Sequence, residues 1–127
     1  ADRFWVNATV ACLLTKALFP VLKKSNSPRV AQISTMMSSI ADNTSGGYYA
    51  YRSSKSALNM LTKSLTIDHP TVSFALIHPG WVKTDMGGES APTEIAESVR
   101  GIWKVISAMS LETSGQFVNF KGDALPW

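Results

Sequence analysis

The chain has 127 residues, of which 45% are hydrophobic and 17% are charged, and its formal net charge at pH 7 is +3. This length suits one domain with its own core, and the apolar content argues against a disordered chain. Lys23-Lys24 is the only basic doublet, so the chain lacks the basic stripe typical of nucleic-acid binding. We therefore expect a globular domain with no nucleic-acid partner.

The first half of the chain predicts a helix, a strand and a second helix. Over residues 2–24, apolar side chains recur every three or four positions, and Pro20 is expected to kink or end this helix. A short β-branched run at 29–34 favours a buried strand, and a loop rich in Ser, Asn and Gly follows it. A second long helix is expected over 48–69.

The second half predicts a strand, a helix and a final strand. The strand covers 72–77, the helix has Pro92 in its first turn, and the last strand covers 116–120. This alternation of helices and apolar strands predicts an α/β fold, with a parallel sheet covered by helices on both faces. Because apolar strands with an open edge are normally paired or covered, we expect missing chain, a partner or a second copy against the strand at 29–34.

Cysteine, histidine and hydropathy patterns place further limits on the chain. The single Cys12 excludes an internal disulfide and suits a reducing compartment. Neither His69 nor His78 has metal-ligand spacing to another His or Cys, so no metal site is predicted, and His78 is interpreted as a hydrogen-bonded strand-end residue. The apolar run at 10–14 is interpreted as too short and too polar in its surroundings to span a bilayer. We expect a cytoplasmic protein with no membrane partner.

Tyr51 and Lys55 are the residues around which a functional site is predicted. Four positions apart on the second helix, they lie on one face, one above the other. A phenol ionises with a pKa of about 10, too high for efficient proton transfer at neutral pH. Because a nearby ammonium favours the phenolate, the pair could protonate a carbonyl oxygen or take the proton of an alcohol.

Four short motifs follow one another along the chain in a specific order. They are Asn7 in Val6-Asn7-Ala8, Ile33-Ser34-Thr35 at the end of a strand, Tyr51 and Lys55 in Tyr-x-x-x-Lys, and His-Pro-Gly-Trp-Val-Lys-Thr at 78–84. With the ending at 115–127, they resemble the C-terminal half of a short-chain dehydrogenase/reductase, in particular the sniffer- and C-factor-like carbonyl reductases. The resemblance implies half of a Rossmann-type doubly wound parallel sheet, with about three strands and three helices. Residues 1–127 would then form a single partial domain.

The resemblance also implies an activity, namely hydride transfer between NAD or NADP and a carbonyl or an alcohol. Tyr51 would be the general acid/base, and Lys55 would activate it and bind the nicotinamide ribose. Asn7 would help to hold a water in a proton relay. The remaining cofactor contacts would come from the loop after the second strand, through Pro79, Gly80, Val82 and Thr84.

One catalytic hydroxyl is left open among three candidates. Alignment by the strand end selects Thr35, whereas counting back from Tyr51 selects Ser38 or Ser39. Thr35 is favoured. Such a hydroxyl would hold the substrate oxygen and stabilise the charge that develops on it.

Residues 1–127 contain no glycine-rich phosphate-binding turn, because Gly46-Gly47 and Gly87-Gly88 lack the strand–turn–helix context that such a turn needs. We therefore expect a truncated chain that lacks the N-terminal dinucleotide-binding half. Two hypotheses follow. The chain is an oxidoreductase fragment, active when the missing half is supplied, or a non-catalytic remnant that acts as an oligomerisation module. The family resemblance implies a homo-oligomer formed through the helices at 2–24 and 48–69.

Overall fold

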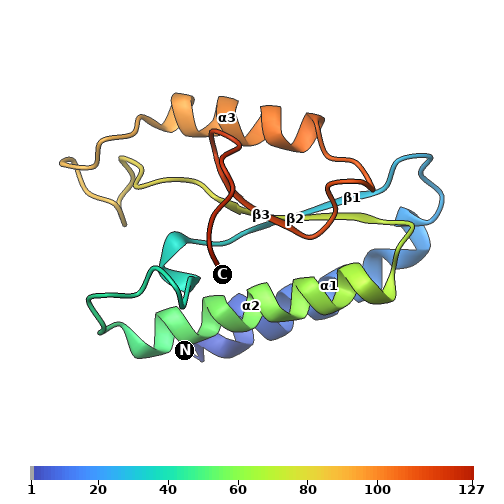
Figure 1. Cartoon of the computed structure of the whole chain (residues 1–127), viewed down its shortest axis with the longest axis horizontal. Helices are drawn as coiled ribbons and strands as arrows, with labels where there is room; N and C mark the ends of the chain where they lie inside the picture. The colour runs from blue at the N-terminus through green and yellow to red at the C-terminus, as the bar shows by residue number, and fades with distance from the viewer. Residues whose placement is uncertain (1) are drawn as a thin grey trace.

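The computed structural model describes residues 2–127 and consists of a parallel sheet between two layers of helices (Figure 1). Strands β1 (Arg29–Ile33), β2 (Ser73–His78) and β3 (Gln116–Asn119) lie in the order β1-β2-β3. Helices α1 (Val10–Leu22) and α2 (Tyr49–Asp68) cover one face, and α3 (Ile95–Ser107) covers the other. The predicted α/β class and parallel sheet are confirmed.

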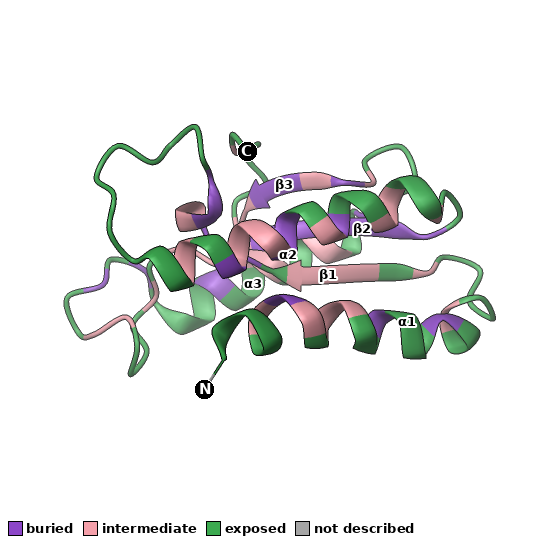
Figure 2. Ribbon diagram, turned by 90° about the horizontal axis from the view of Figure 1, so that it is seen from below, coloured by how far each residue is buried: buried purple, intermediate pink, exposed green. Residues whose placement is uncertain are grey.

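The central strand β2 forms the core because both of its faces are covered. In Figure 2 it is buried along almost its whole length. Phe74 and Leu76 point to the layer of α1 and α2, and Ala75 and Ile77 point to the layer of α3. This period of two, in a strand whose four central residues are apolar, explains why the run was recognisable from sequence.

The N-terminal helix differs from the single regular helix expected over 2–24. A π-helical turn, η1 (Trp5–Thr9), precedes α1, and the Asp2 carboxylate accepts the Phe4 backbone N–H at 3.0 Å. Pro20 lies inside α1, and the helix ends at Leu22, where the Lys23 N–H donates to the Phe19 carbonyl at 2.9 Å. Pro20 therefore lies in the last turn, and the helix ends two residues after it, near the expected place.

One stripe of α1 packs on the sheet and the opposite stripe does not. Thr15 and Phe19 are buried, whereas much of the helix is exposed in Figure 2. The exposed apolar stripe consists of Val10, Leu13, Leu14, Ala17, Leu18 and Val21. Beside it, β1 is an edge strand that pairs only with β2 among the described residues.

The apolar run of the N-terminal helix was expected to be too short and too polar in its surroundings to span a bilayer. Judged by the length and composition of the helix, this expectation is wrong. Trp5–Leu22 covers 18 residues with a mean hydropathy of 1.5, which is enough to cross a bilayer. Core helices of soluble proteins meet the same criterion. In this structure the helix contributes Ala8 and Phe19 to the core beneath the sheet, so the criterion is weak evidence for a membrane span.

Two further elements differ from expectation. A 3₁₀ turn, η2 (Met36–Ser38), lies in the predicted loop after β1. Helix α3 begins at Ile95, not around Pro92, because Thr93 is extended and bridges to Val82. The Lys83 N–H donates to the Thr93 carbonyl at 2.9 Å, and this contact ties the loop after β2 to the start of α3.

Candidate functional site

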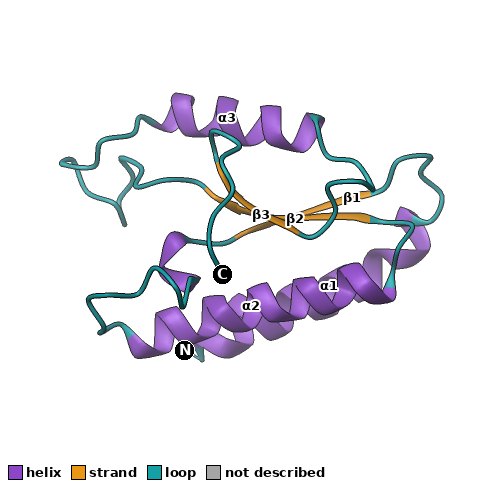
Figure 3. Cartoon of the chain, in the orientation of Figure 1, coloured by secondary structure: helices purple, strands orange, loops and turns teal. Residues whose placement is uncertain are grey.

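Two long loops follow the carboxyl ends of β1 and β2 and lie at the same end of the sheet (Figure 3). In open α/β sheets, ligands bind outside these strand ends. A cleft of about 430 Å³ lies there, which we call the loop cleft. Its lining includes Ser34, Thr35, Tyr51, Trp81, Met86 and residues 78–80, 82 and 84.

A second, larger cleft of about 820 Å³ lies at the N-terminal ends of η1 and α2, and we call it the helix-end cleft. Tyr51, Trp81 and Met86 line both clefts. The remaining lining residues are Asp2, Arg3, Val6, Asn7, Met37 and Tyr48. Tyr51 therefore lies at the junction of two ligand-sized spaces.

Tyr51 and Lys55 belong to the first two turns of α2. Within residues 2–127, the Tyr51 hydroxyl forms no hydrogen bond. It is therefore free to contact a ligand. One turn later, the Lys55 Nζ donates to the Ile33 carbonyl at 3.1 Å, which fixes the ammonium against the end of β1. Burial lowers the pKa of Lys55. Lys55 lines neither cleft.

The three candidate hydroxyls have different environments. Thr35 lines the loop cleft with Tyr51, and its Oγ1 accepts the Met37 N–H at 3.2 Å. Ser38 is buried, and its hydroxyl donates to the Thr35 carbonyl at 2.6 Å. Ser39 is also buried and accepts the Asp42 N–H at 3.0 Å. Of the three, Thr35 alone lines the cleft that contains Tyr51.

A buried hydrogen-bond network that sequence reasoning missed supports the turn after β1. Asn59 accepts the Ser34 hydroxyl at 2.6 Å, and its side-chain amide donates to the Ser38 hydroxyl at 2.7 Å. All three residues are buried. Asn59 lies four residues after Lys55, so it shares a helix face with Tyr51 and Lys55. A polar residue on this face was the signal in the sequence that could have revealed the network.

Asn59→Leu is expected to lower the free energy of unfolding by about 2–4 kcal/mol, because the Ser34 and Ser38 hydroxyls would stay buried without this partner. Urea denaturation followed by circular dichroism measures the change. Ser53→Ala, at an exposed position of the same helix, serves as the control and is expected to change it by less than about 0.5 kcal/mol. An Asn59→Leu variant as stable as the parent chain would rule out a stabilising role for the network.

Asn7 lies in the middle of the π-helical turn η1 and lines the helix-end cleft together with Tyr51. Its amide nitrogen donates to the Ser54 hydroxyl at 3.0 Å, and Ser54 is fully buried in α2. Isolated π turns within helices occur frequently at functional sites. This contact ties the position of Asn7 to the helix that carries Tyr51 and Lys55.

The loop after β2 has a backbone that only glycine fits at one position. Gly80 has a φ of +87°, and a Cβ there would lie 2.7 Å from Phe120 Cε1. The Pro79 carbonyl accepts the Ser98 hydroxyl at 2.6 Å, which ties the loop to α3. These contacts set the position of the loop that borders the cleft.

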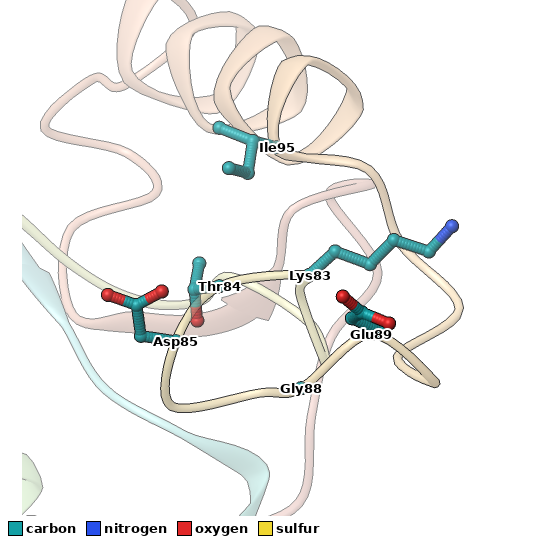
Figure 4. A pocket seen from close by; sticks show the side chains of 6 residues that line it. All are labelled: Lys83, Thr84, Asp85, Gly88, Glu89 and Ile95. Atoms are coloured by element: carbon teal, nitrogen blue, oxygen red, sulfur yellow. The ribbon is translucent and has the colours of Figure 1, made fainter.

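Thr84 and its neighbours border a shallow depression on the outer side of this loop (Figure 4). The Thr84 hydroxyl accepts the Gly87 N–H at 3.1 Å. Lys83 and Glu89 project on one side of the loop in Figure 4, and Asp85 projects on the other. Across residues 2–127, no group of three His, Cys, Asp or Glu side chains is arranged to hold a metal ion.

His78 ends β2 and lines the loop cleft. Its Nδ1 is buried without a hydrogen-bond partner in the described part of the chain. The interpretation of His78 as a hydrogen-bonded strand-end residue is therefore wrong for this atom. Burial lowers the pKa of His78, so the imidazole that faces the cleft is neutral at pH 7.

The lowered pKa of His78 predicts a loss of stability in acid. Below a pH of about 6.5 the unfolded chain binds more protons at this position than the folded chain does, so the free energy of unfolding falls as the pH falls. His78→Asn is expected to reduce this loss. Urea denaturation of both proteins at about pH 7.5 and about pH 5 measures the difference, and equal losses in the two proteins would contradict the prediction.

The fold and the position of the clefts define a Rossmann-type α/β domain with a ligand site beyond its strand ends. Residues 2–95 match the family model described as short chain dehydrogenase. The chain belongs to the short-chain dehydrogenase family.

Individual relatives agree with this assignment. The chain is 43% identical to the C-signal of Myxococcus xanthus over 100% of its own length and 78% of that protein. It superimposes on the carbonyl reductase Sniffer of D. melanogaster with a TM-score of 0.91 at 40% identity. An NADPH-bound carbonyl reductase from chicken fatty liver also gives 0.91, at 36% identity. In both superpositions, 98% of this chain matches 55% of the solved chain.

Proposed function

We propose that this chain carries the proton-transfer part of an oxidoreductase site, which acts on a carbonyl or an alcohol with a nicotinamide dinucleotide. The observation that carries the proposal is that Thr35, Tyr51 and the loop at 78–84 line one cleft, while Lys55 is anchored at the adjoining strand end. Membership of the short-chain dehydrogenase family and similarity to carbonyl reductases support it.

In this proposal the Tyr51 hydroxyl donates a proton to a carbonyl oxygen, or accepts one from an alcohol in the reverse direction. The Thr35 hydroxyl hydrogen-bonds to the same oxygen and stabilises its developing charge. Its proton is available because its Oγ1 accepts from the Met37 N–H and donates to no group in residues 2–127. The Lys55 ammonium stabilises negative charge on the Tyr51 oxygen. Asn7 holds a water of the relay that returns a proton to Tyr51.

The dinucleotide fits these residues at its nicotinamide end only. Lys55 would contact the ribose, and the backbone of Gly80 and Val82 with the Thr84 hydroxyl would hold the carboxamide or a nearby phosphate. When bound, the cofactor supplies or accepts the hydride. The rest of the dinucleotide needs groups beyond residues 1–127, which contain no glycine-rich phosphate-binding turn. NADPH is the first cofactor to test, because the chicken carbonyl reductase is described as NADPH-bound.

Calorimetric titration of the 127-residue chain with NADPH and with NADH tests the cofactor part of the proposal. We expect saturable binding that Lys55→Ala weakens and that Lys63→Ala, at an exposed position two turns along α2, leaves unchanged. A folded chain that binds neither nucleotide at concentrations up to about 1 mM, a binding free energy of only about −4 kcal/mol, would contradict the proposal.

A second candidate function, non-catalytic association, is favoured by the exposed apolar stripe of α1. We propose that two copies pack through α1 and α2, because the stripe runs the length of α1 beside the edge strand β1. Patches of this kind mark interaction surfaces. For either function we propose a cytoplasmic setting, which the free thiol of Cys12 suits.

Analytical ultracentrifugation tests this association. We expect a dimer that becomes a monomer when Leu14 and Leu18, both on the stripe, are replaced by Glu. Leu111→Glu is the control, because Leu111 is exposed but lies outside the helices. A parent chain that stays monomeric at about 0.1 mM would exclude a dimer with a dissociation constant below that range.

A further inference from the structure

The helix-end cleft offers a ligand mainly apolar, aromatic and sulfur-containing groups. Val6, Met37, Tyr48, Trp81 and Met86 form much of its lining. Its volume of about 820 Å³ lies within the usual range for small-molecule sites, which is about 300–1,000 Å³. Such a lining favours a ligand with a large apolar surface.

Two polar groups of this cleft are occupied by the protein itself. The Asp2 carboxylate accepts the N–H groups of Phe4 and Trp5 at 3.0 and 3.3 Å. The Asn7 amide nitrogen donates to Ser54. The Tyr51 hydroxyl remains free at the junction with the loop cleft. A ligand therefore meets a largely apolar wall whose free polar groups include the Tyr51 and Tyr48 hydroxyls and the Arg3 side chain.

Trp81 is exposed but held in place. Its indole N–H donates to the Gly87 carbonyl at 2.8 Å, while 57% of the residue stays accessible. Met86 lies in the loop segment between Trp81 and Gly87. It is 90% exposed and lines the same cleft. An aromatic ring that is fixed before binding loses little conformational entropy when a ligand stacks on it.

Tyr48 has the only positive φ among the non-glycine residues described, at +50°. This conformation costs free energy in a residue with a Cβ. The residue is 71% exposed, so burial in the core does not compensate for the strain. A tyrosine at a position that glycine would occupy with less strain, at the edge of a cleft, indicates a role in binding.

We propose that the helix-end cleft binds planar aromatic ketones, with the ring system against Trp81 and Tyr48 and the carbonyl directed to Tyr51. The aromatic faces and methionine sulfurs select a flat π system over a puckered ring of equal size. The direction of the carbonyl rests on the proposed function, whereas the aromatic site does not.

Titration with 2-acetylnaphthalene and with cyclohexyl methyl ketone, in the absence of nucleotide, tests this site. Calorimetry or saturation-transfer NMR is expected to show binding of the naphthyl ketone at least tenfold tighter. Trp81→Ala should weaken it about tenfold, which corresponds to about 1.4 kcal/mol. Trp81→Phe should retain most of the affinity, which separates stacking from the anchoring of the loop by the indole N–H.

Tyr48→Gly provides a second variant that removes the ring without adding strain. It should weaken binding of the naphthyl ketone without lowering the melting temperature, because glycine tolerates a positive φ. Tyr49→Ala and Trp103→Ala are matched controls, since both residues are exposed and neither lines the cleft. Both are expected to bind like the parent chain.

Equal affinity for the two ketones, or unchanged affinity in folded Trp81→Ala, would overturn the aromatic site. The test of the aromatic site can be distinguished from the test of the proposed function. Binding of the naphthyl ketone with no NADPH-dependent reduction would refute the function and leave the site intact. Reduction of both ketones at equal kcat/KM would support the function and refute the site.

Discussion

Tyr51→Phe is expected to lower kcat/KM for NADPH-dependent ketone reduction by about 10²- to 10⁴-fold, the usual contribution of a general acid. The variant removes the proton that the carbonyl oxygen receives and keeps the ring that lines both clefts. The measurement is initial rate against ketone concentration, with NADPH oxidation followed by absorbance.

Tyr49→Phe is the control for this variant. It makes the same chemical change two positions earlier, at a side chain that is 84% exposed and lines neither cleft. Its kcat/KM should equal that of the parent chain. Loss of a hydroxyl that takes no part in proton transfer would change kcat/KM little. A decrease in kcat/KM of less than about tenfold for Tyr51→Phe would therefore exclude Tyr51 as the general acid.

Gly101→Ala is expected to lower the free energy of unfolding by about 2–3 kcal/mol, an effect of overpacking. A Cβ at Gly101 would lie 2.2 Å from the backbone oxygen of Phe120 and 2.9 Å from its ring. Because the closest contact is with backbone, a change of rotamer cannot relieve it. Thermal denaturation measures the effect, and a stability equal to that of the parent chain would show that α3 can move away at little cost.

The same substitution is expected to weaken NADPH binding. The ring of Phe120 also lies 2.7 Å from the position of a Cβ on Gly80, so displacing Phe120 disturbs the loop that borders the cleft. Arg100→Ala, at the adjacent exposed position of α3, is the control and should change stability by less than about 0.5 kcal/mol. Unchanged NADPH affinity in folded Gly101→Ala would show that Phe120 does not set the loop.

The sheet could be predicted from sequence because its strands are short apolar runs bounded by turn residues. The strands predicted at 29–34 and 72–77 are present within one residue at each end. The start of α3 could not be predicted from Pro92, because the bridge between Val82 and Thr93 forms across a loop. The π turn at Trp5–Thr9 leaves the apolar spacing almost unchanged, so no pattern in the sequence reported it.

The arrangement of candidate site residues was predictable where they are close in sequence. It was not predictable where they are distant in sequence and come together only in the fold. Tyr51 and Lys55 are one helical turn apart, so their shared face follows from spacing alone. The bond from Lys55 to the Ile33 carbonyl joins residues 22 positions apart. The different environments of Thr35, Ser38 and Ser39 depend on the 3₁₀ turn, which folds the Ser38 hydroxyl back onto the Thr35 carbonyl.

The most direct test of the central claim is transfer of deuterium from labelled NADPH to a ketone. The chain would be incubated with 2-acetylnaphthalene and NADPH that carries deuterium at the transferred position, and the alcohol analysed by mass spectrometry. The account predicts one deuterium in the alcohol formed by the parent chain and by Tyr49→Phe, with little or no labelled alcohol from Tyr51→Phe. A folded chain that binds NADPH and the ketone yet forms no labelled alcohol would contradict it.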